Sequence, residues 1–243
     1  MDKQLTQEEW VKYCADEMRL LEPILNELGF VIDSEQIHMK GERYLMSGRK
    51  LVLTGVRTSD GARVIIKASS NDRGAHEIER ERTSRRILDG LDFAYQKFTS
   101  PEELSFGRKA GFTIFISHYV DQERPFIERD SKEQFFLALR ALKMQESVHA
   151  TTYGHARTIR RAFGTMNSRD YIEAFQKLRA GILKSIVEPS LHDVLACAGA
   201  LLETHQETIE RYCGFLTHAD FVPHNIRVKD GEIYLLDSSS LQF

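Results

Sequence analysis

The chain opens with a segment whose apolar side chains recur every three or four residues, the spacing that places them on one face of a helix. Thr6 and Glu9 have the spacing of a capping box at its start, and Gly29 provides a stop. The pattern therefore predicts a helix over residues 6–28, with an apolar face formed by Trp10, Tyr13, Cys14, Met18, Leu21, Ile24, Leu25 and Leu28.

Short runs rich in β-branched and aromatic residues then predict the strands of an antiparallel sheet. An Asp60-Gly61 turn joins the second run to the third, and an Ala110-Gly111 turn joins the last two. A charged helix is expected between the third and fourth runs, from about Gly74 to Leu91. The five runs cover residues 30–32, 51–56, 63–68, 103–108 and 112–120.

Beyond residue 120 the apolar spacing becomes helical, and a compact hairpin closes the pattern. We therefore expect an α+β, bilobal protein with a ligand cleft between its lobes. The N-terminal lobe would span residues 1–120, and the mainly helical C-terminal lobe residues 121–243. The C-terminal elements are helices over 131–149, 168–186 and 190–212, and hairpin strands over 226–228 and 233–236 joined by a turn at Lys229-Asp230-Gly231.

Composition excludes several classes of protein. The 33 basic and 36 acidic residues give a net charge of −3 without a basic stripe, so no nucleic-acid partner is expected. The three cysteines are far apart and predict neither a disulfide framework nor a thiolate zinc site. No apolar run reaches the roughly 20 residues that span a membrane, and the polar start is unlike a secretory signal. We therefore expect a cytoplasmic protein without a membrane partner, and its oligomeric state stays open.

Most of the candidate catalytic and metal-binding residues lie in residues 218–225, HADFVPHN, and at Asp237. Asp220 and Asn225 flank a loop that enters the C-terminal hairpin, and Asp237 follows the return strand of the same hairpin. The two ends of one hairpin can thus bring Asn225 and Asp237 together, and their oxygen atoms suit a hard cation such as Mg²⁺. Phosphoryl transfer needs such ligands, a carboxylate that orients the attacking hydroxyl, and a cation on the phosphates.

Lys67 is the candidate for the cation. It ends the run Val-Ile-Ile-Lys in a predicted strand, where a lone lysine is more often a solvated edge residue. Glu81, on the predicted charged helix, could hold the Lys67 ammonium towards a nucleotide. Glu77, one turn earlier, is the competing partner.

These motifs resemble the aminoglycoside phosphotransferase and choline kinase family, the small-molecule branch of the protein-kinase-like fold. The resemblance covers roughly residues 40–240 and also includes Glu-Ser-Val-His-Ala at 146–150. It implies a five-stranded N-terminal lobe, ATP and Mg²⁺ as cofactors, and adenine bound by the connecting segment at about 117–121. It further implies transfer of the γ-phosphate to a hydroxyl of a small molecule, such as an aminoglycoside, an amino alcohol, a sugar or an amino acid.

By the same resemblance, Asp220 is the catalytic base or hydroxyl-orienting group, and His218 braces the catalytic loop. Asn225 and Asp237 hold magnesium. Lys67 pairs with the nucleotide phosphates and is oriented by Glu81.

Three departures from the family pattern stand out. Ala219 replaces the usual glycine of the loop, and alanine is small enough to be tolerated there. The hairpin expected to cover the phosphates holds Gly41 and Gly48 but no G-x-G-x-x-G. The chain ends six residues after Asp237, so we expect a C-terminal lobe truncated relative to the family.

Other interpretations stay open. The chain could be a nucleotide-binding pseudokinase or regulatory module that phosphorylates no acceptor. His218, Asp220 and His224 could instead bind zinc or iron, although no HExxH pair supports this. The basic stretch 153–169 is expected to be a solvated loop, with binding of an acceptor or another anion as its functional alternative.

Overall fold

The computed structural model describes residues 6–36, 49–93, 98–122, 124–163, 166–186, 188–218, 220–238 and 241–242. The chain forms two compact units. The first holds the described residues within 1–90, 98–141 and 220–240, and the second holds those within 91–97, 142–219 and 241–243. The division of the chain into lobes near residue 120 stays a prediction. Gly41 and Gly48, in the expected phosphate-covering hairpin, lie outside the described residues.

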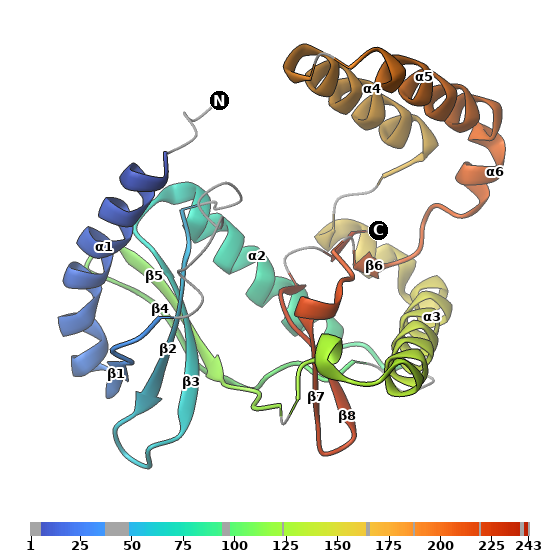
Figure 1. Cartoon of the computed structure of the whole chain (residues 1–243). Coiled ribbons are helices and arrows are strands. Elements are labelled where there is room, and N and C mark those ends of the chain that lie inside the picture. Colours follow the sequence, from blue (N-terminus) through green and yellow to red (C-terminus); the bar gives the residue numbers. More distant parts are fainter. Residues whose placement is uncertain are drawn as a thin grey trace. The chain divides into compact units, whose positions relative to one another are not determined.

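A five-stranded antiparallel sheet forms the centre of the first unit (Figure 1). The strand order is β1-β2-β3-β5-β4, and antiparallel hydrogen bonds join every neighbouring pair. The sequence-based strand assignments are confirmed to within two residues at each end. The strands are β1 (Phe30–Ile32), β2 (Leu51–Arg57), β3 (Arg63–Ser69), β4 (Glu103–Lys109) and β5 (Phe112–His118).

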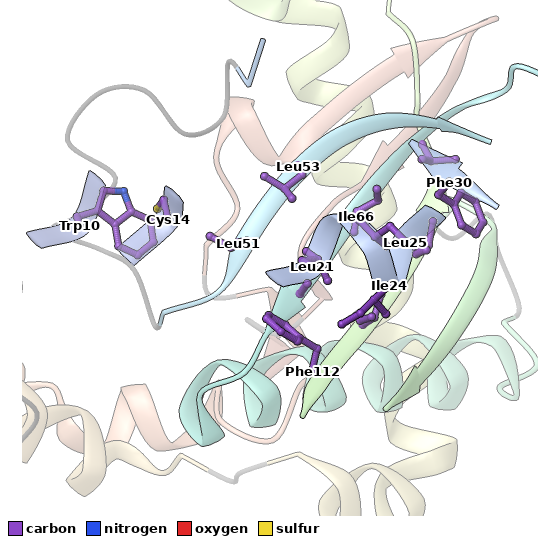
Figure 2. Close-up of a cluster of buried hydrophobic side chains, with 14 residues drawn as sticks. Trp10, Cys14, Leu21, Ile24, Leu25, Phe30, Leu51, Leu53, Ile66 and Phe112 are labelled. Atoms are coloured by element: carbon purple, nitrogen blue, oxygen red, sulfur yellow. The ribbon is translucent and has the colours of Figure 1, made fainter. Parts of the chain in front are cut away.

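Helix α1 (Gln7–Glu27) covers one face of this sheet. Its predicted capping box is present, because the Thr6 hydroxyl accepts from the Glu9 amide and the Glu9 carboxylate accepts from the Thr6 amide. The apolar face of α1 packs on the sheet, and full burial of a leucine, isoleucine or phenylalanine side chain contributes about 1.5–3 kcal/mol to stability. Figure 2 shows this core, in which α1 supplies Trp10, Cys14, Leu21, Ile24 and Leu25 and the strands supply Leu51, Leu53, Ile66 and Phe112.

Helix α2 (Asp72–Asp89) packs on β3 and β5. Side chains alternate between the faces of a strand, so Lys67 and Phe115, which are paired in register, point away from the α1 core. Ile78 of α2 is fully buried, and the Asn71 side chain caps the helix by accepting from the Arg73 amide. The sheet therefore has an apolar face and a second face that carries charge.

The C-terminal hairpin also belongs to the first unit. After a 3-10 turn at Pro223–Asn225, strands β7 (Ile226–Lys229) and β8 (Glu232–Leu235) pair around Asp230 and Gly231. Both turn residues have positive φ, of 49° and 76°, which Asp and Gly tolerate better than bulky residues do. The Asp-Gly turn expected from the sequence is confirmed.

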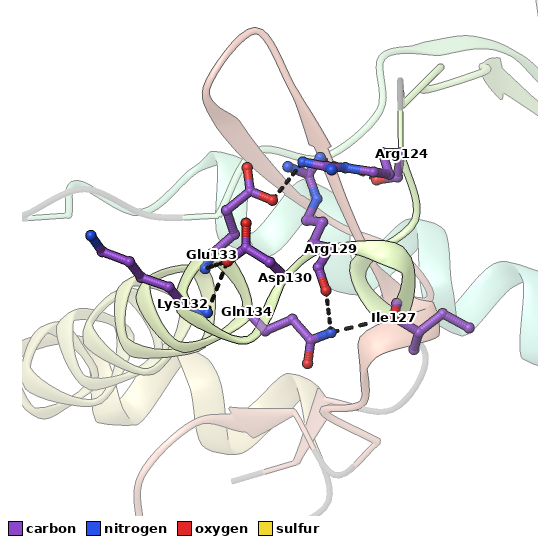
Figure 3. A network of polar contacts seen from close by, with 7 residues as sticks. All are labelled: Arg124, Ile127, Arg129, Asp130, Lys132, Glu133 and Gln134. Carbon is purple, nitrogen blue, oxygen red and sulfur yellow. Dashed lines mark hydrogen bonds and ion pairs between the residues drawn. The ribbon is translucent and has the colours of Figure 1, made fainter.

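A polar network fixes the segment that leads from the sheet into helix α3 (Ser131–Ala162), as Figure 3 shows. One carboxylate oxygen of Asp130 accepts from the amides of Lys132 and Glu133, both at 2.9 Å, and so caps the start of α3. Gln134 donates to the Arg129 carbonyl at 2.7 Å, and Arg124 pairs with Glu133. The chain after β5 is therefore held by side chains as well as by its backbone.

The second unit contains helices and one short strand pair. Its elements are the remainder of α3, α4 (Ser168–Ser185), α5 (Pro189–Thr204), α6 (Gln206–Arg211), β6 (Thr217–His218) and β9 (Leu241–Gln242). Asn167 and Asp170 form a capping box at the start of α4. Among the described residues, no helix is long and apolar enough to span a membrane.

Two expectations about these helices are wrong. The helix predicted to end at His149 continues to Ala162, so much of the stretch expected to be a basic loop is helical. Arg160 and Arg161 lie in the last turn of α3, where cations interact favourably with the helix dipole. The helix predicted over 190–212 is two helices, because the backbone at His205 leaves the α conformation.

Two strand glycines give a matched test of this packing. A methyl group on Gly55 would lie 2.4 Å from the Val31 carbonyl oxygen and 3.3 Å from Ile66 Cδ1, whereas one on Gly107 would meet nothing within 4 Å. We expect Gly55→Ala to lower the free energy of unfolding by about 2 kcal/mol through overpacking. Gly107→Ala should leave it unchanged or raise it by about 0.5 kcal/mol. Urea denaturation measures both, and equal values for the two variants would contradict the packing described for β1 and β2.

Candidate functional site

The charged face of the sheet carries a buried ion pair between β3 and α2. Lys67 Nζ lies 2.5 Å from Glu81 Oε2, and the side chains are 10% and 0% exposed. Glu77 faces other cations, since its carboxylate lies 3.9 Å from Lys50 and 3.7 Å from Arg73. Of the two carboxylates considered from the sequence, Glu81 is therefore the one that contacts Lys67.

Arg85 completes this pair into a cluster of three charges. Its Nη2 donates to Glu81 Oε1 at 2.7 Å, and its Nη1 donates to the Pro101 carbonyl at 3.0 Å. The guanidinium also lies over the Phe115 ring, 5.1 Å from its centroid. Each oxygen of Glu81 thus contacts a different cation. Sequence analysis missed this role of Arg85, although its (i, i+4) spacing from Glu81 is the signal for such a contact.

The protonation of the cluster follows from burial and charge. Burial opposes ionisation of Glu81, but Lys67 and Arg85 together hold the pKa of this carboxyl below its usual value. Burial lowers the pKa of Lys67, while Glu81 and Asp237 act in the opposite direction. Negative charge added beside Lys67, as from a phosphate group, would further favour its protonated form.

Asp220 and Asn225 are joined directly. The Asn225 amide nitrogen donates to Asp220 Oδ2 at 2.8 Å and to the Asp220 carbonyl at 2.9 Å. Both amide protons are thereby used, and the Asn225 side-chain oxygen is left as an acceptor. The Leu236 amide donates to the Asn225 carbonyl at 2.8 Å, which places Asp237 beside Asn225 at the open end of the hairpin.

A cavity of about 340 Å³ adjoins these groups, and every residue that lines it belongs to the first unit. Its volume is within the range of small-ligand sites. The sequence-predicted residues Lys67, Asn225 and Asp237 all line it. The other walls come from β2, β3, β5, the segment after β5, and the hairpin, including Val52, Ile65, Ser117, Tyr119, Val120, Arg227 and Leu236.

The donor set at one end of this cavity fits Mg²⁺. Asn225 offers its amide oxygen and Asp237 a carboxylate, and both line the cavity. Mg²⁺ is commonly held by one or two carboxylates and completes its shell with phosphate and water oxygens. Within the described residues, no three His, Cys, Asp or Glu side chains gather in a way that could hold a metal. Because the donors of Asn225 and Asp237 are oxygen atoms, they fit a hard cation that also binds phosphate oxygens.

His218 lies in the second unit, in strand β6, and is 2% exposed. Its neighbour Thr217 shares a 3.1 Å hydrogen bond with His149 of α3, and His149 also contacts Gln145 at 2.9 Å. Burial lowers the pKa of His149, which favours its neutral form. The predicted role of His218 in bracing the catalytic loop stays a prediction.

Lys50 is a further cation that sequence analysis missed. Its side chain is 10% exposed and lies 3.9 Å from Glu77 of α2. It lies directly before β2 and two residues before Val52, which is paired in register with Lys67.

The buried cluster makes a stability test possible. Glu81→Gln leaves Lys67 and Arg85 without their shared carboxylate, so the free energy of unfolding at pH 7 should fall by about 3 kcal/mol. Because the folded-state pKa of Glu81 is lowered, its contribution is complete above the usual value of 4.5 and is lost as the pH falls through the lowered value. The two proteins should therefore converge in stability in acid.

Glu79→Gln is the matched control on the same helix. Glu79 forms a surface ion pair with Arg108, whose side chain is 70% exposed, so its loss should cost less than about 1 kcal/mol. Chemical denaturation between pH 3 and pH 8 measures both variants. Equal losses at pH 7 would contradict the energetic importance of the buried cluster.

Comparison with known proteins bears on the fold of the chain. No protein-family model matches the chain, and no curated protein matches it in sequence. Among solved structures, a streptomycin–ATP–APH(2″)-IIa ternary complex matches with a TM-score of 0.54 and 17% identity, over 90% of this chain and 71% of the other.

Spectinomycin phosphotransferase APH(9)-Ia, in complex with ADP and spectinomycin, matches with a TM-score of 0.54 and 16% identity, over 92% of this chain and 69% of the other. A gentamicin–APH(2″)-IIa complex matches with a TM-score of 0.50 and 16% identity, over 90% and 70% of the two chains. The fold expected from the motifs is confirmed: the chain has the bilobal, protein-kinase-like α+β fold of the aminoglycoside phosphotransferases.

Proposed function

We propose that the chain is an ATP- and Mg²⁺-dependent phosphotransferase that moves the γ-phosphoryl group to a hydroxyl of a small molecule. The observation that carries this proposal is the arrangement of Lys67, Asn225 and Asp237 around one cavity, with Asp220 hydrogen-bonded to Asn225. A cation, two oxygen ligands and a carboxylate are the parts that phosphoryl transfer requires. The solved structures of similar fold include complexes with ATP and with ADP.

Lys67 would bind the nucleotide phosphates as a positive charge held in place. Glu81 prevents the ammonium from turning away, because the carboxylate contacts it at 2.5 Å from a buried position on α2. Arg85 in turn fixes Glu81 through its second oxygen. Little reorganisation is then needed when the phosphates arrive, which is the advantage of a preorganised charge.

Asp220 would orient the acceptor hydroxyl and take its proton. The Asn225 amide occupies Asp220 Oδ2, so Oδ1 is the atom that would accept the proton. The acceptor oxygen forms a bond to the γ-phosphorus, the bond from this phosphorus to the β,γ-bridging oxygen breaks, and ADP leaves. Mg²⁺ bound to Asn225 and Asp237 would supply positive charge for the phosphate oxygens.

Nucleotide binding gives the first test. ATP with Mg²⁺ should raise the melting temperature, since a ligand at 100 times its Kd stabilises the folded state by about 2.7 kcal/mol. ATP with EDTA should give a smaller shift. Asp237→Asn should reduce the difference between these two conditions, because it removes a carboxylate ligand of the metal. A thermal shift assay measures all four combinations, and absence of any shift with wild-type protein would refute the proposal.

Turnover gives the second test. A panel of aminoglycosides, amino alcohols, sugars and amino acids is offered with ATP, and transfer is followed as labelled phosphate on the acceptor. Asp220→Asn should retain the ATP-induced thermal shift but lower kcat by about 10²–10⁴-fold, the usual contribution of a general base. Transfer by this variant at the wild-type rate would rule out the role assigned to Asp220.

Asp230→Asn is the control for this substitution. It makes the same chemical change in the turn of the hairpin, where asparagine also tolerates the positive φ of 49°. Its kcat should equal that of wild-type protein. If wild-type protein binds ATP but phosphorylates no acceptor, the nucleotide-binding regulatory module considered from the sequence becomes the better description.

A further inference from the structure

Strand β7 carries a guanidinium into the cavity beside Asn225. Arg227 lines the cavity and is partly buried, and within the described part of the chain its side chain makes no hydrogen bond, ion pair or ring contact. Removing a charged group from water without a partner costs free energy, so such a side chain is expected to meet a ligand. The proposed function gives Lys67, Asn225 and Asp237 roles at the phosphates and leaves Arg227 without one.

The position of Arg227 along the cavity follows from the strands. Arg227 is two residues beyond Asn225, which ends the 3-10 turn before β7, so their Cα atoms are at most about 7 Å apart. It also lines a second cavity of about 200 Å³, with Gln122, Phe126 and Ile127. These residues continue the chain from Val120, which lines the first cavity. Arg227 is therefore at the end of the cavity that adjoins the segment after β5.

Apolar side chains form part of the cavity wall, together with polar side chains of β5. Ile65 lies two residues before Lys67 on the same face of β3 and is paired in register with Ser117 of β5. Val120 and Leu236 add further apolar surface. A flat aromatic ring fits a cation set among apolar groups, because the ring can bury its faces while its π electrons attract the charge. Arginine is suited to this contact, since its guanidinium is planar and weakly hydrated.

We propose that Arg227 stacks on the nucleobase of the bound nucleotide and gives the site a preference for purines over pyrimidines. This inference rests on the proposed function, because it assigns the base of the same nucleotide. A purine presents a larger face than a pyrimidine does, so it gains more from both apolar burial and the cation–π contact. A contact from Arg227 to the phosphates is the alternative that the experiment must exclude.

Calorimetric titration of the full chain with three ligands separates these cases: ATP, CTP and inorganic tripolyphosphate, each with Mg²⁺. Arg227→Ala should weaken ATP binding about tenfold. It should weaken CTP binding less and leave tripolyphosphate binding unchanged. Lys229→Ala is the control, because Lys229 is an exposed cation on the same strand that does not line the cavity. All three affinities should be unchanged in this control.

Arg227→Lys is a second variant in case Arg227→Ala fails to fold. It keeps the charge and a long side chain but removes the planar guanidinium. It should also weaken ATP more than tripolyphosphate. Equal losses for ATP and tripolyphosphate would show a phosphate contact and overturn the inference, as would unchanged ATP binding in both Arg227 variants. Either result leaves the proposed function standing, whereas failure of wild-type protein to bind ATP would refute both proposals.

Discussion

One buried carboxylate shared by two cations sets the geometry on which the candidate site depends. Glu81 joins Lys67 of β3 to Arg85 of its own helix, and Arg85 reaches the main chain at Pro101. Burying three charges is costly unless each is paired, so this cluster specifies one position of α2 against the sheet more than it adds stability. The resulting position keeps the Lys67 ammonium at the wall of the cavity.

The hairpin at residues 226–235 forms another wall of the cavity, and backbone hydrogen bonds rather than buried charges fix its geometry. Short backbone hydrogen bonds, including that from the Leu236 amide to the Asn225 carbonyl, hold the two ends of the hairpin together. Asp237 follows with a positive φ of 54°, a conformation that costs most residues free energy and that aspartate tolerates. The proposed oxygen ligands are thus brought together by the backbone rather than by packing of their own side chains.

Sequence patterns predicted the parts of this protein that depend on local physics. The capping box at Thr6, the Asp-Gly turn at 230–231 and the strand periodicity each involve residues within a few positions of one another. The end of α3 was missed because nothing local stops the helix at His149. The role of Lys50 was missed because it depends on which side chains lie across an interface, and spacing along the chain does not report that. The role of Arg85 was missed although its (i, i+4) spacing from Glu81 indicated the contact.

The candidate site shows the same division. Resemblance to a family selected Lys67, Glu81, His218, Asp220, Asn225 and Asp237, and the structure places Lys67, Asn225 and Asp237 at one cavity. The residues selected by this resemblance give no information about Arg227, since a charged residue on a short exposed hairpin is ordinary in any sequence. Its distinction comes from its partly buried position without a protein partner, which only three-dimensional structure reveals.

The side-chain amide of Asn225 limits which residues can replace it beside Asp220. Because both amide protons of Asn225 point to Asp220, a carboxyl group in the same place would set two acids within 2.8 Å of each other. Two carboxylates at this distance repel each other, and such a pair titrates as a unit rather than as two independent acids. Asn and Asp have nearly the same size and shape, yet exchanging them here would replace two donated hydrogen bonds with a repulsive contact.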